Sequence, residues 1–293
     1  MKKIYYLIIS LRPSQWIKNF LIFAGLIFAQ KLLDFPLLMK TVFGFFLFSF
    51  SAGSLYIIND IKDYEKDRFH PKKKERPIAS GKISKQEALI FALILLFVSL
   101  YLSYLLSLPF FLLLLLYIGL SFLYTLFLKE IVILDVIMVS LFFLLRAWAG
   151  TLLINVSLSE WLFICTILLA LFLALTKRKS EIFLLNDSAN SHRKVLKNYS
   201  HDFIDQMISI TTASALIAYA IYTVAPETVH KFKTKNLVLT LPFVIYGIFR
   251  YLYLIYHKRF NDNPDRAFVK DIPLLVDIFL WLVWVIVIIY KFK

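Results

Sequence analysis

The stretch NDIKDYEKDRFHPKKKERPIASG, residues 59–81, is a dense run of mixed charge inside an oily chain. It holds three aspartates, two glutamates and seven lysines or arginines, and long runs of Leu, Ile, Phe and Val flank it on both sides. A polar segment between two long apolar runs is typical of a loop that joins two apolar helices. The sequence therefore predicts a bundle of apolar helices, and it raises the question of what so many charges bind at one end of it.

The composition indicates a membrane protein. The chain has 293 residues, of which 60% are hydrophobic, and its mean hydropathy is +0.75, well above an ordinary soluble domain. Helices are expected because lipid offers no partner to free backbone groups, and a span needs about 18 to 20 apolar residues. Nine segments fit: 16–34, 36–58, 86–106, 109–127, 132–154, 159–176, 207–225, 237–256 and 273–290. We expect an all-α, polytopic membrane protein with nine transmembrane helices in a single domain, residues 1–293.

The first ten residues, MKKIYYLIIS, look like the start of a signal peptide. Arg12 and Pro13 follow without a small-residue cleavage site, so we expect a short interfacial helix that leads into the first span. The single cysteine, Cys165, lies in an apolar run and is expected to serve packing alone.

The net charge of +14 follows the positive-inside rule. With the N-terminus in the cytoplasm, 24 of the 33 lysines and arginines fall on cytoplasmic segments and seven on outer segments. This bias places the long loops 59–85, 177–206 and 257–272 on the cytoplasmic side of the cell (inner or plasma) membrane and the C-terminus outside. It explains the basic excess without a nucleic-acid partner, and it leaves the acids in these loops unexplained.

Four residues in the quoted stretch, Asn59, Asp60, Asp63 and Asp67, form the pattern N-D-x-x-D-x-x-x-D. On a helix that continues the second span, this spacing puts the three aspartates on one stripe, where they repel one another. A magnesium ion would compensate them, because it takes oxygen ligands and commonly combines one or two carboxylates with phosphate oxygens. The alternative is a solvated face with local salt bridges. The position at the end of a membrane helix favours the metal–diphosphate site, with Asn59 and the aspartates as its metal ligands and Asp60, Asp63 and Asp67 as catalytic residues.

Basic residues follow the acids in the same loop. Arg76 lies beside the rigid Pro77 and is the candidate for binding diphosphate oxygens. The run of Lys72, Lys73 and Lys74 is better explained by contact with anionic lipid.

Further polar residues lie at the predicted ends of other spans. One helix face is predicted to carry Lys177, Arg178 and Glu181. These residues form either a phosphate-binding site that faces the acidic stripe or a membrane anchor with a local salt bridge. Lys129 falls in a very short cytoplasmic turn.

Other charged candidates fall within the predicted spans or at their edge. Asp135 and Arg146 are expected to face the bundle interior, either in a functional site or as buried structural pairs. Lys18, at the first membrane crossing, either snorkels to the surface or binds a phosphate.

Other chemistries lack their signatures in this sequence. It contains no G-x-x-x-x-G-K-[ST], no G-x-G-x-x-G and no Cys/His metal spacing.

At this point the motifs match a known family. N-D-I-K-D-Y-E-K-D at 59–67, followed by R-P-I-A-S-G at 76–81, resembles the first signature of the UbiA superfamily of intramembrane prenyltransferases. Aromatic prenyltransferases of that superfamily carry a second aspartate-rich motif after the sixth helix, whereas residues 177–181 read KRKSE here. This basic variant resembles the decaprenyl-phosphate phosphoribosyltransferase branch. Further segments resemble the same branch: RPSQWIKN, YTLFLKEIVILDV, LLRAWAG, LFLALTKRKSE, VLKNYSHDFIDQM and NPDRAFVKDIPLL.

The resemblance implies a nine-helix bundle that holds magnesium and a diphosphate. Its activity would be transfer of 5-phosphoribose from 5-phospho-ribose 1-diphosphate to a polyprenyl phosphate, with release of diphosphate, as a pentosyltransferase of cell-envelope (cell wall) precursor synthesis. The cofactor would be Mg²⁺, and the partners would be the two substrates and the lipid bilayer; a homo-oligomer is compatible with the sequence. The implied substrate-binding residues are Lys18, Asn59, Arg76, Lys129, Asp135, Arg146, Lys177, Arg178, Glu181 and Tyr199. Ile272 departs from the basic residue common in that branch, which leaves Asp271 outside the predicted site.

Two other functions stay open on the sequence alone. The first is a UbiA-type prenyltransferase that moves a prenyl group from a prenyl diphosphate to an aromatic or lipid acceptor; the basic residues 177–181 disfavour it. The second is a transporter or channel with an acidic cytoplasmic gate, for which the sequence shows no clear internal repeat.

Overall fold

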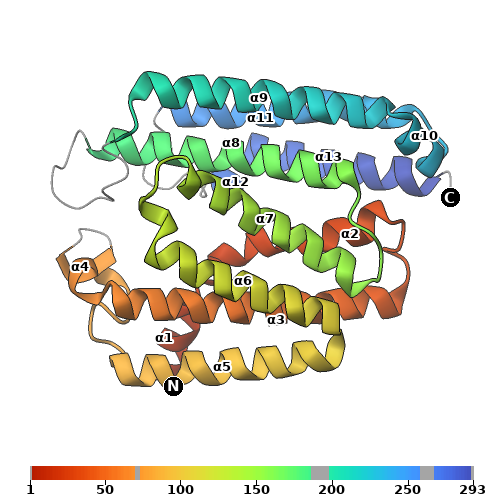
Figure 1. The fold of residues 1–293 in the computed structure, drawn as a ribbon. Helices are drawn as coiled ribbons and strands as arrows, with labels where there is room; N and C mark the ends of the chain where they lie inside the picture. Colours follow the sequence, from red (N-terminus) through yellow and green to blue (C-terminus); the bar gives the residue numbers. More distant parts are fainter. Residues whose placement is uncertain (1, 70–72, 186–197, 258–266, 292–293) are drawn as a thin grey trace. The chain divides into compact units, whose positions relative to one another are not determined.

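The computed structural model describes residues 2–69, 73–185, 198–257 and 267–291, and these residues form helices, turns and loops without a strand. The elements are α1 (Lys2–Ser10), η1 (Pro13–Leu21), α2 (Ile22–Phe28), α3 (Phe35–Lys62), α4 (Tyr64–Phe69), η2 (Lys73–Glu75), α5 (Lys85–Leu106), α6 (Leu108–Leu126), η3 (Leu128–Glu130), α7 (Leu134–Leu153), α8 (Glu160–Leu185), α9 (His201–Val224), α10 (Pro226–Phe232), η5 (Asn236–Thr240), α11 (Leu241–Tyr256), α12 (Ala267–Lys270) and α13 (Ile272–Lys291). Figure 1 shows the helices in chain order.

Eight segments of the described chain are helical, long and apolar enough to cross a membrane. They correspond to eight of the nine predicted spans, so the all-α, multi-pass architecture is confirmed. The last of these segments before α13 combines η5 with α11 over Asn236–Tyr256.

The remaining predicted span, residues 16–34, is irregular. Its chain forms the 3₁₀-helix η1 and then the short helix α2, instead of one continuous α-helix. The backbone of Ile22, the first residue of α2, lies directly against Gly150 in α7. A Cβ atom built on Gly150 would be 1.8 Å from the carbonyl oxygen of Ile22.

Two helices extend beyond the predicted spans. α8 continues past the predicted end at residue 176 to Leu185, and it therefore carries Lys177, Arg178 and Glu181 within the helix. Lys, Arg and Glu favour helix nearly as well as Leu does, so the end of an apolar run need not end the helix. α9 begins at His201, ahead of the predicted 207, because the side chain of Ser200 caps it by accepting from the N–H of Phe203.

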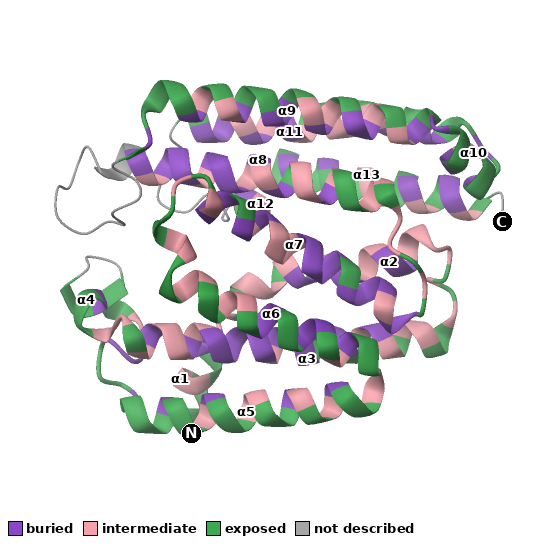
Figure 2. Cartoon of the chain, in the orientation of Figure 1, coloured by how far each residue is buried: buried purple, intermediate pink, exposed green. Residues whose placement is uncertain are grey.

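The contacts divide the chain into two compact units. Unit 1 comprises Met1–Lys129 and Leu145–Leu158, and α3 is its central helix. Small residues on α3 are buried, among them Ser49, Ala52 and Gly53, which lets neighbouring helices approach closely. α5 packs along α3 and exposes most of its other face, as the colours of Figure 2 show.

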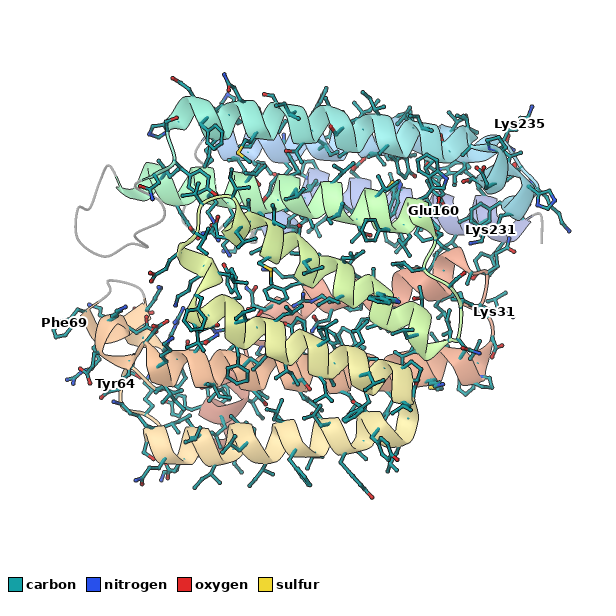
Figure 3. All side chains as sticks on the ribbon, viewed as in Figure 1. Lys31, Tyr64, Phe69, Glu160, Lys231 and Lys235 are labelled. Carbon is teal, nitrogen blue, oxygen red and sulfur yellow. The ribbon has the colours of Figure 1, made fainter. Side chains whose placement is uncertain are left out.

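Unit 2 comprises Glu130–Leu144 and Ser159–Lys293. In it α8 packs along α9, and α11 packs along α13. A buried cluster that includes Phe172, Leu175, Tyr251 and Leu274 joins these helices. Lys231 and Lys235 lie at the end of α9 that is opposite His201 (Figure 3).

Candidate active site

The first polar cluster lies in unit 1 and joins two buried aspartates to two arginines. Asp60, in the last turn of α3, accepts at Oδ1 from Arg12 Nη2 at 2.5 Å and from Arg76 Nη1 at 2.9 Å. The same Nη1 of Arg76 donates to Oδ2 of Asp67, in α4, at 2.6 Å. Lys73 Nζ lies 3.9 Å from Oδ1 of Asp67. These five residues are the Asp60 cluster, in which one guanidinium nitrogen brings two carboxylates together.

Apolar packing fixes the backbone of the Asp60 cluster. Leu11, Ile57 and Ile78 belong to one buried cluster, and each is within three residues of Arg12, Asp60 or Arg76 along the chain. The charged side chains are thus carried by segments that are anchored in the core, which holds a binding site in a defined geometry.

The predicted stripe of Asp60, Asp63 and Asp67 is interrupted. α3 ends at Lys62, and Asp63 has φ −88° and ψ 8° outside the helix before α4 begins at Tyr64. Asp60 and Asp67 are buried, whereas Asp63 is half-buried and outside the Arg76 bridge. Figure 3 shows Tyr64 and Phe69 on α4, and the Phe69 side chain, which is 86% exposed, points outward.

The donor set of the Asp60 cluster fits magnesium bound together with a ligand. Within the described residues no group of three or more Asp, Glu, His or Cys side chains is placed to hold a metal ion alone. Two carboxylates do converge, because Asp60 Oδ1 and Asp67 Oδ2 share one donor atom. Magnesium typically takes one or two carboxylates and completes its shell with phosphate oxygens and water. Asp60 and Asp67 could therefore hold it, with Asn59 and Asp63 half-buried on the same segment.

The second polar cluster lies in unit 2 and centres on Asp135, the second residue of α7. Its Oδ2 lies 2.9 Å from Nε of Arg178, in α8, and both side chains are almost fully buried. Arg178 also forms an ion pair with Glu181 through Nη1. Tyr199 donates its hydroxyl to Oδ1 of Asp135 at 2.7 Å. In this Asp135 cluster the intramembrane acid has a cationic partner.

Tyr199 also stabilises an unusual backbone. Its hydroxyl accepts the N–H of Ile133 at 2.7 Å, and Ile133 has φ +69°, which is rare for a β-branched residue. Burial, and then the hydrogen bond to Asp135, raise the pKa of Tyr199, so the phenol stays protonated and keeps donating to the carboxylate.

Removing this hydroxyl is expected to destabilise unit 2. Tyr199→Phe leaves both the Ile133 N–H and a buried carboxylate oxygen without a partner, which costs about 1 to 3 kcal/mol of unfolding free energy. The midpoint of thermal unfolding in detergent measures the loss. The control is Tyr246→Phe, because Tyr246 is 47% exposed on α11; equal midpoints for the two variants would contradict the prediction.

Arg146 is buried in the part of α7 that belongs to unit 1, and it contacts neutral polar groups and aromatic rings. Its Nε donates to Oδ1 of Asn19 at 2.7 Å, and its Nη2 donates to the Tyr117 hydroxyl at 3.1 Å. Its guanidinium also lies 5.4 Å from the ring centroid of Phe48. Asn19 in turn donates to Ser49 at 2.9 Å. Hydrogen bonds and aromatic faces thus position this intramembrane cation.

Comparison with known proteins now decides the family. A family model described as the UbiA prenyltransferase family matches residues 19–288. The chain belongs to the UbiA prenyltransferase family. It is therefore a multi-pass membrane transferase, and the resemblance read from the motifs is confirmed.

Named relatives and one solved structure agree with this family. The chain is 30% identical to a decaprenyl-phosphate phosphoribosyltransferase of Mycolicibacterium smegmatis over 290 residues, which are 95% of this chain and 90% of the relative. It is 29% identical over 217 residues to a protein of the same name from Mycobacterium tuberculosis, covering 73% of this chain and 72% of that one. A UbiA homologue from Archaeoglobus fulgidus, bound to GPP and Mg²⁺, has the same fold, with a TM-score of 0.70 and 19% identity over 97% of this chain and 99% of the other.

Three of the predicted substrate-binding residues lie outside the Asp60 and Asp135 clusters. Lys18 is half-buried in η1, Lys129 is half-buried in η3, and Lys177 is half-buried in α8 one residue before Arg178. Each has interactions of its own in the structure. The predicted loop 257–272 is largely outside the described residues, as are parts of 59–85 and 177–206; the last described segment of 257–272 places Asp271 in a pair with Arg250 at 2.9 Å.

No site role was predicted for Arg12 and Lys73 of the Asp60 cluster, or for Lys179 of α8. Arg12 was named only as the residue that follows the first apolar run, although it contacts Asp60 across 48 residues of chain. Lys179 is buried, forms an ion pair with Asp205 and lies 3.4 Å from the ring centroid of Tyr256. For Arg12 the sequence offers one signal, a charged residue beside a proline near the membrane. For Lys179 it offers no comparable signal.

Proposed function

We propose that this UbiA-family chain transfers 5-phosphoribose from 5-phospho-ribose 1-diphosphate to a polyprenyl phosphate. The observation that carries the proposal is the chemistry of residues 177–181. Where prenyltransferases of the resembled type have a second acidic motif, this chain has Arg178, buried and held by Asp135 and Glu181. An additional buried guanidinium suits substrates with additional phosphate groups, because Arg binds phosphate through paired N–H donors. Relatives of nearly the same length that bear the phosphoribosyltransferase name support this choice.

In the proposed reaction the charged residues are assigned to the anionic groups of the substrates. Asp60 and Asp67 would hold magnesium on the diphosphate, where the metal would neutralise the leaving group. Arg12 and Arg76 donate to diphosphate oxygens from the same cluster. Arg178, with Lys177, Lys129 and Lys18, is assigned to the sugar 5-phosphate and the lipid phosphate.

The bond changes require little acid–base chemistry. The bond between the anomeric carbon and the diphosphate oxygen breaks, and its electron pair leaves with the diphosphate. An oxygen of the polyprenyl phosphate forms the new bond at the opposite face, and this oxygen is already anionic near neutral pH. The protein therefore acts chiefly by positioning and by stabilising charge. The polyprenyl tail remains among apolar helices in the hydrocarbon.

The orientation in the membrane is part of the proposal. We place the N-terminus and both clusters on the cytoplasmic side, in line with the 24 to 7 bias of basic residues. A water-soluble sugar diphosphate would reach the clusters from that side.

The test uses purified protein in detergent with magnesium, radiolabelled 5-phospho-ribose 1-diphosphate and a polyprenyl phosphate. We expect label to move into the lipid phase, and chelation of magnesium to stop it. The proposal would be overturned if the protein transferred label from a prenyl diphosphate to an aromatic or lipid acceptor and transferred no pentose. The prenyltransferase alternative would then hold, and the Asp60 cluster would bind the prenyl diphosphate.

A further inference from the structure

The acids proposed to hold magnesium already have cationic partners. Asp60 Oδ1 accepts from both Arg12 and Arg76, and Asp67 Oδ2 accepts from Arg76. The side chain of Lys73 is 3.9 Å from the other oxygen of Asp67. A metal that binds these carboxylates must therefore share or displace the guanidinium groups.

The charge balance opposes binding of the metal by itself. The Asp60 cluster holds two carboxylates and three cations, Arg12, Lys73 and Arg76. A divalent ion would add two positive charges to a group that is already in cationic excess, and in a partly buried site this repulsion is strong. A diphosphate brings several negative charges and reverses the balance.

The exposure of the side chains shows which partners are placed to move. The carboxylate side chains of Asp60 and Asp67 are 6% and 4% exposed, whereas those of Arg12 and Arg76 are each 28% exposed. The guanidiniums thus lie toward the open side of the cluster and the acids toward its interior. Arg12 is further held by its position 4.9 Å from the Tyr56 ring centroid, which keeps its charge near the cluster after it leaves Asp60.

We infer that the Asp60 cluster works by exchange of partners. In the free protein Arg12 and Arg76 neutralise Asp60 and Asp67; when donor and metal bind, the acids turn to the metal and the arginines turn to diphosphate oxygens. The inference rests on the proposed function, and it adds a consequence that the proposed function does not contain. Arg12 hinders binding of metal alone and assists binding of metal with diphosphate.

A single variant should therefore change two quantities in opposite directions. The affinity for Mn²⁺ alone should rise, and the gain in that affinity on adding diphosphate should fall. In Arg12→Gln the competing charge is gone, so Mn²⁺ alone should bind about 5-fold tighter or more than in the wild type. The gain in Mn²⁺ affinity on adding diphosphate should shrink by a similar factor, because Mn²⁺ alone already binds more tightly and Arg12 no longer assists the complex with diphosphate. In the wild type we expect that gain to be at least about 10-fold.

The experiment is equilibrium dialysis of the purified full chain in detergent against Mn²⁺, with and without labelled inorganic diphosphate. Free Mn²⁺ is measured by electron paramagnetic resonance in the protein-free chamber, which accounts for Mn²⁺–diphosphate in solution. Arg68→Gln is the matched control: Arg68 is an exposed arginine of α4 that lies over the Tyr64 ring at 5.6 Å, and it should leave both affinities unchanged. Arg76→Gln is the second variant and should shift them in the same direction as Arg12→Gln.

The outcomes separate the inference from the proposed function. Weaker or unchanged binding of Mn²⁺ alone in Arg12→Gln and Arg76→Gln overturns the exchange, even if pentose transfer is observed. Coupling of equal size in the wild type and both variants also overturns it, because direct contact between metal and diphosphate would then suffice. An exchange with the expected signs in a protein that fails to transfer pentose would overturn the proposed function alone.

Discussion

Asp60→Asn is expected to reduce pentose transfer by about 100- to 1,000-fold, the range seen when one charge-stabilising group is removed from an active site. The amide keeps an oxygen that can accept from Arg12 and Arg76, so the local structure should persist. It loses the negative charge that a hard divalent cation requires. The initial rate of label transfer into the lipid phase, at saturating magnesium, measures the effect.

The control is a neighbouring acid outside the Asp60 cluster. Glu65 lies in α4 on the same segment, with a side chain that is 73% exposed and pairs with Lys85 at 3.6 Å. Glu65→Gln should keep close to wild-type activity, because a surface pair of this kind contributes little. If Asp60→Asn and Glu65→Gln had similar rates, Asp60 would not be a ligand in the reaction.

Gly150→Ala is expected to destabilise the fold by about 3 kcal/mol or more, at the upper end of the range for overpacking. The added Cβ would be 1.8 Å from the carbonyl oxygen of Ile22 and 2.7 Å from its carbonyl carbon. Both are backbone atoms, so relief requires movement of the segment where η1 passes into α2. Thermal unfolding in detergent should show a clearly lowered midpoint and a lower yield of folded protein.

Gly119 offers the reverse case within the same unit. It lies in α6, and a Cβ built on it meets nothing within 4 Å. Gly119→Ala should be neutral or stabilising by up to about 1 kcal/mol, since alanine is the better helix former. A loss of similar size in both variants would show that the Gly150 contact is not the cause.

Hydropathy predicted the fold because it reports which segments are compatible with lipid. It located the chain segments of α3, α5, α6, α7 and α13 closely. It could not report the path of residues 13–28, because a change from 3₁₀-helix to α-helix within one apolar run leaves no signal in hydropathy. It also could not report the end of α8, because charged residues that favour helix continue it past the apolar run, and their tertiary contacts, such as that of Arg178 with Asp135, are not visible in hydropathy.

The site was predictable in its residue types and less so in its geometry. Spacing placed Asp60, Asp63 and Asp67 on one ideal helix, and the break at Asp63 changed which acids converge. The contacts of Asp60 with Arg12 and of Asp135 with Arg178 join residues that are 48 and 43 positions apart. Such pairings follow from the packing of helices and leave no periodic signal in a single sequence. The roles of these residues in catalysis remain predictions for the assays described above.

The length of α8 has a consequence for the choice of membrane. Its 26 residues, from Glu160 to Leu185, span about 39 Å at 1.5 Å per residue, whereas the hydrocarbon layer is about 30 Å thick. The helix is therefore longer than the oily layer is thick by roughly two turns, and Arg178 and Glu181 lie within about two turns of its C-terminal end. Hydrophobic mismatch would set how far these side chains rise into the headgroup layer. Lipids with longer acyl chains would place Arg178 and Glu181 closer to the hydrocarbon. The thickness of the host bilayer would then determine the depth at which these side chains meet phosphate groups.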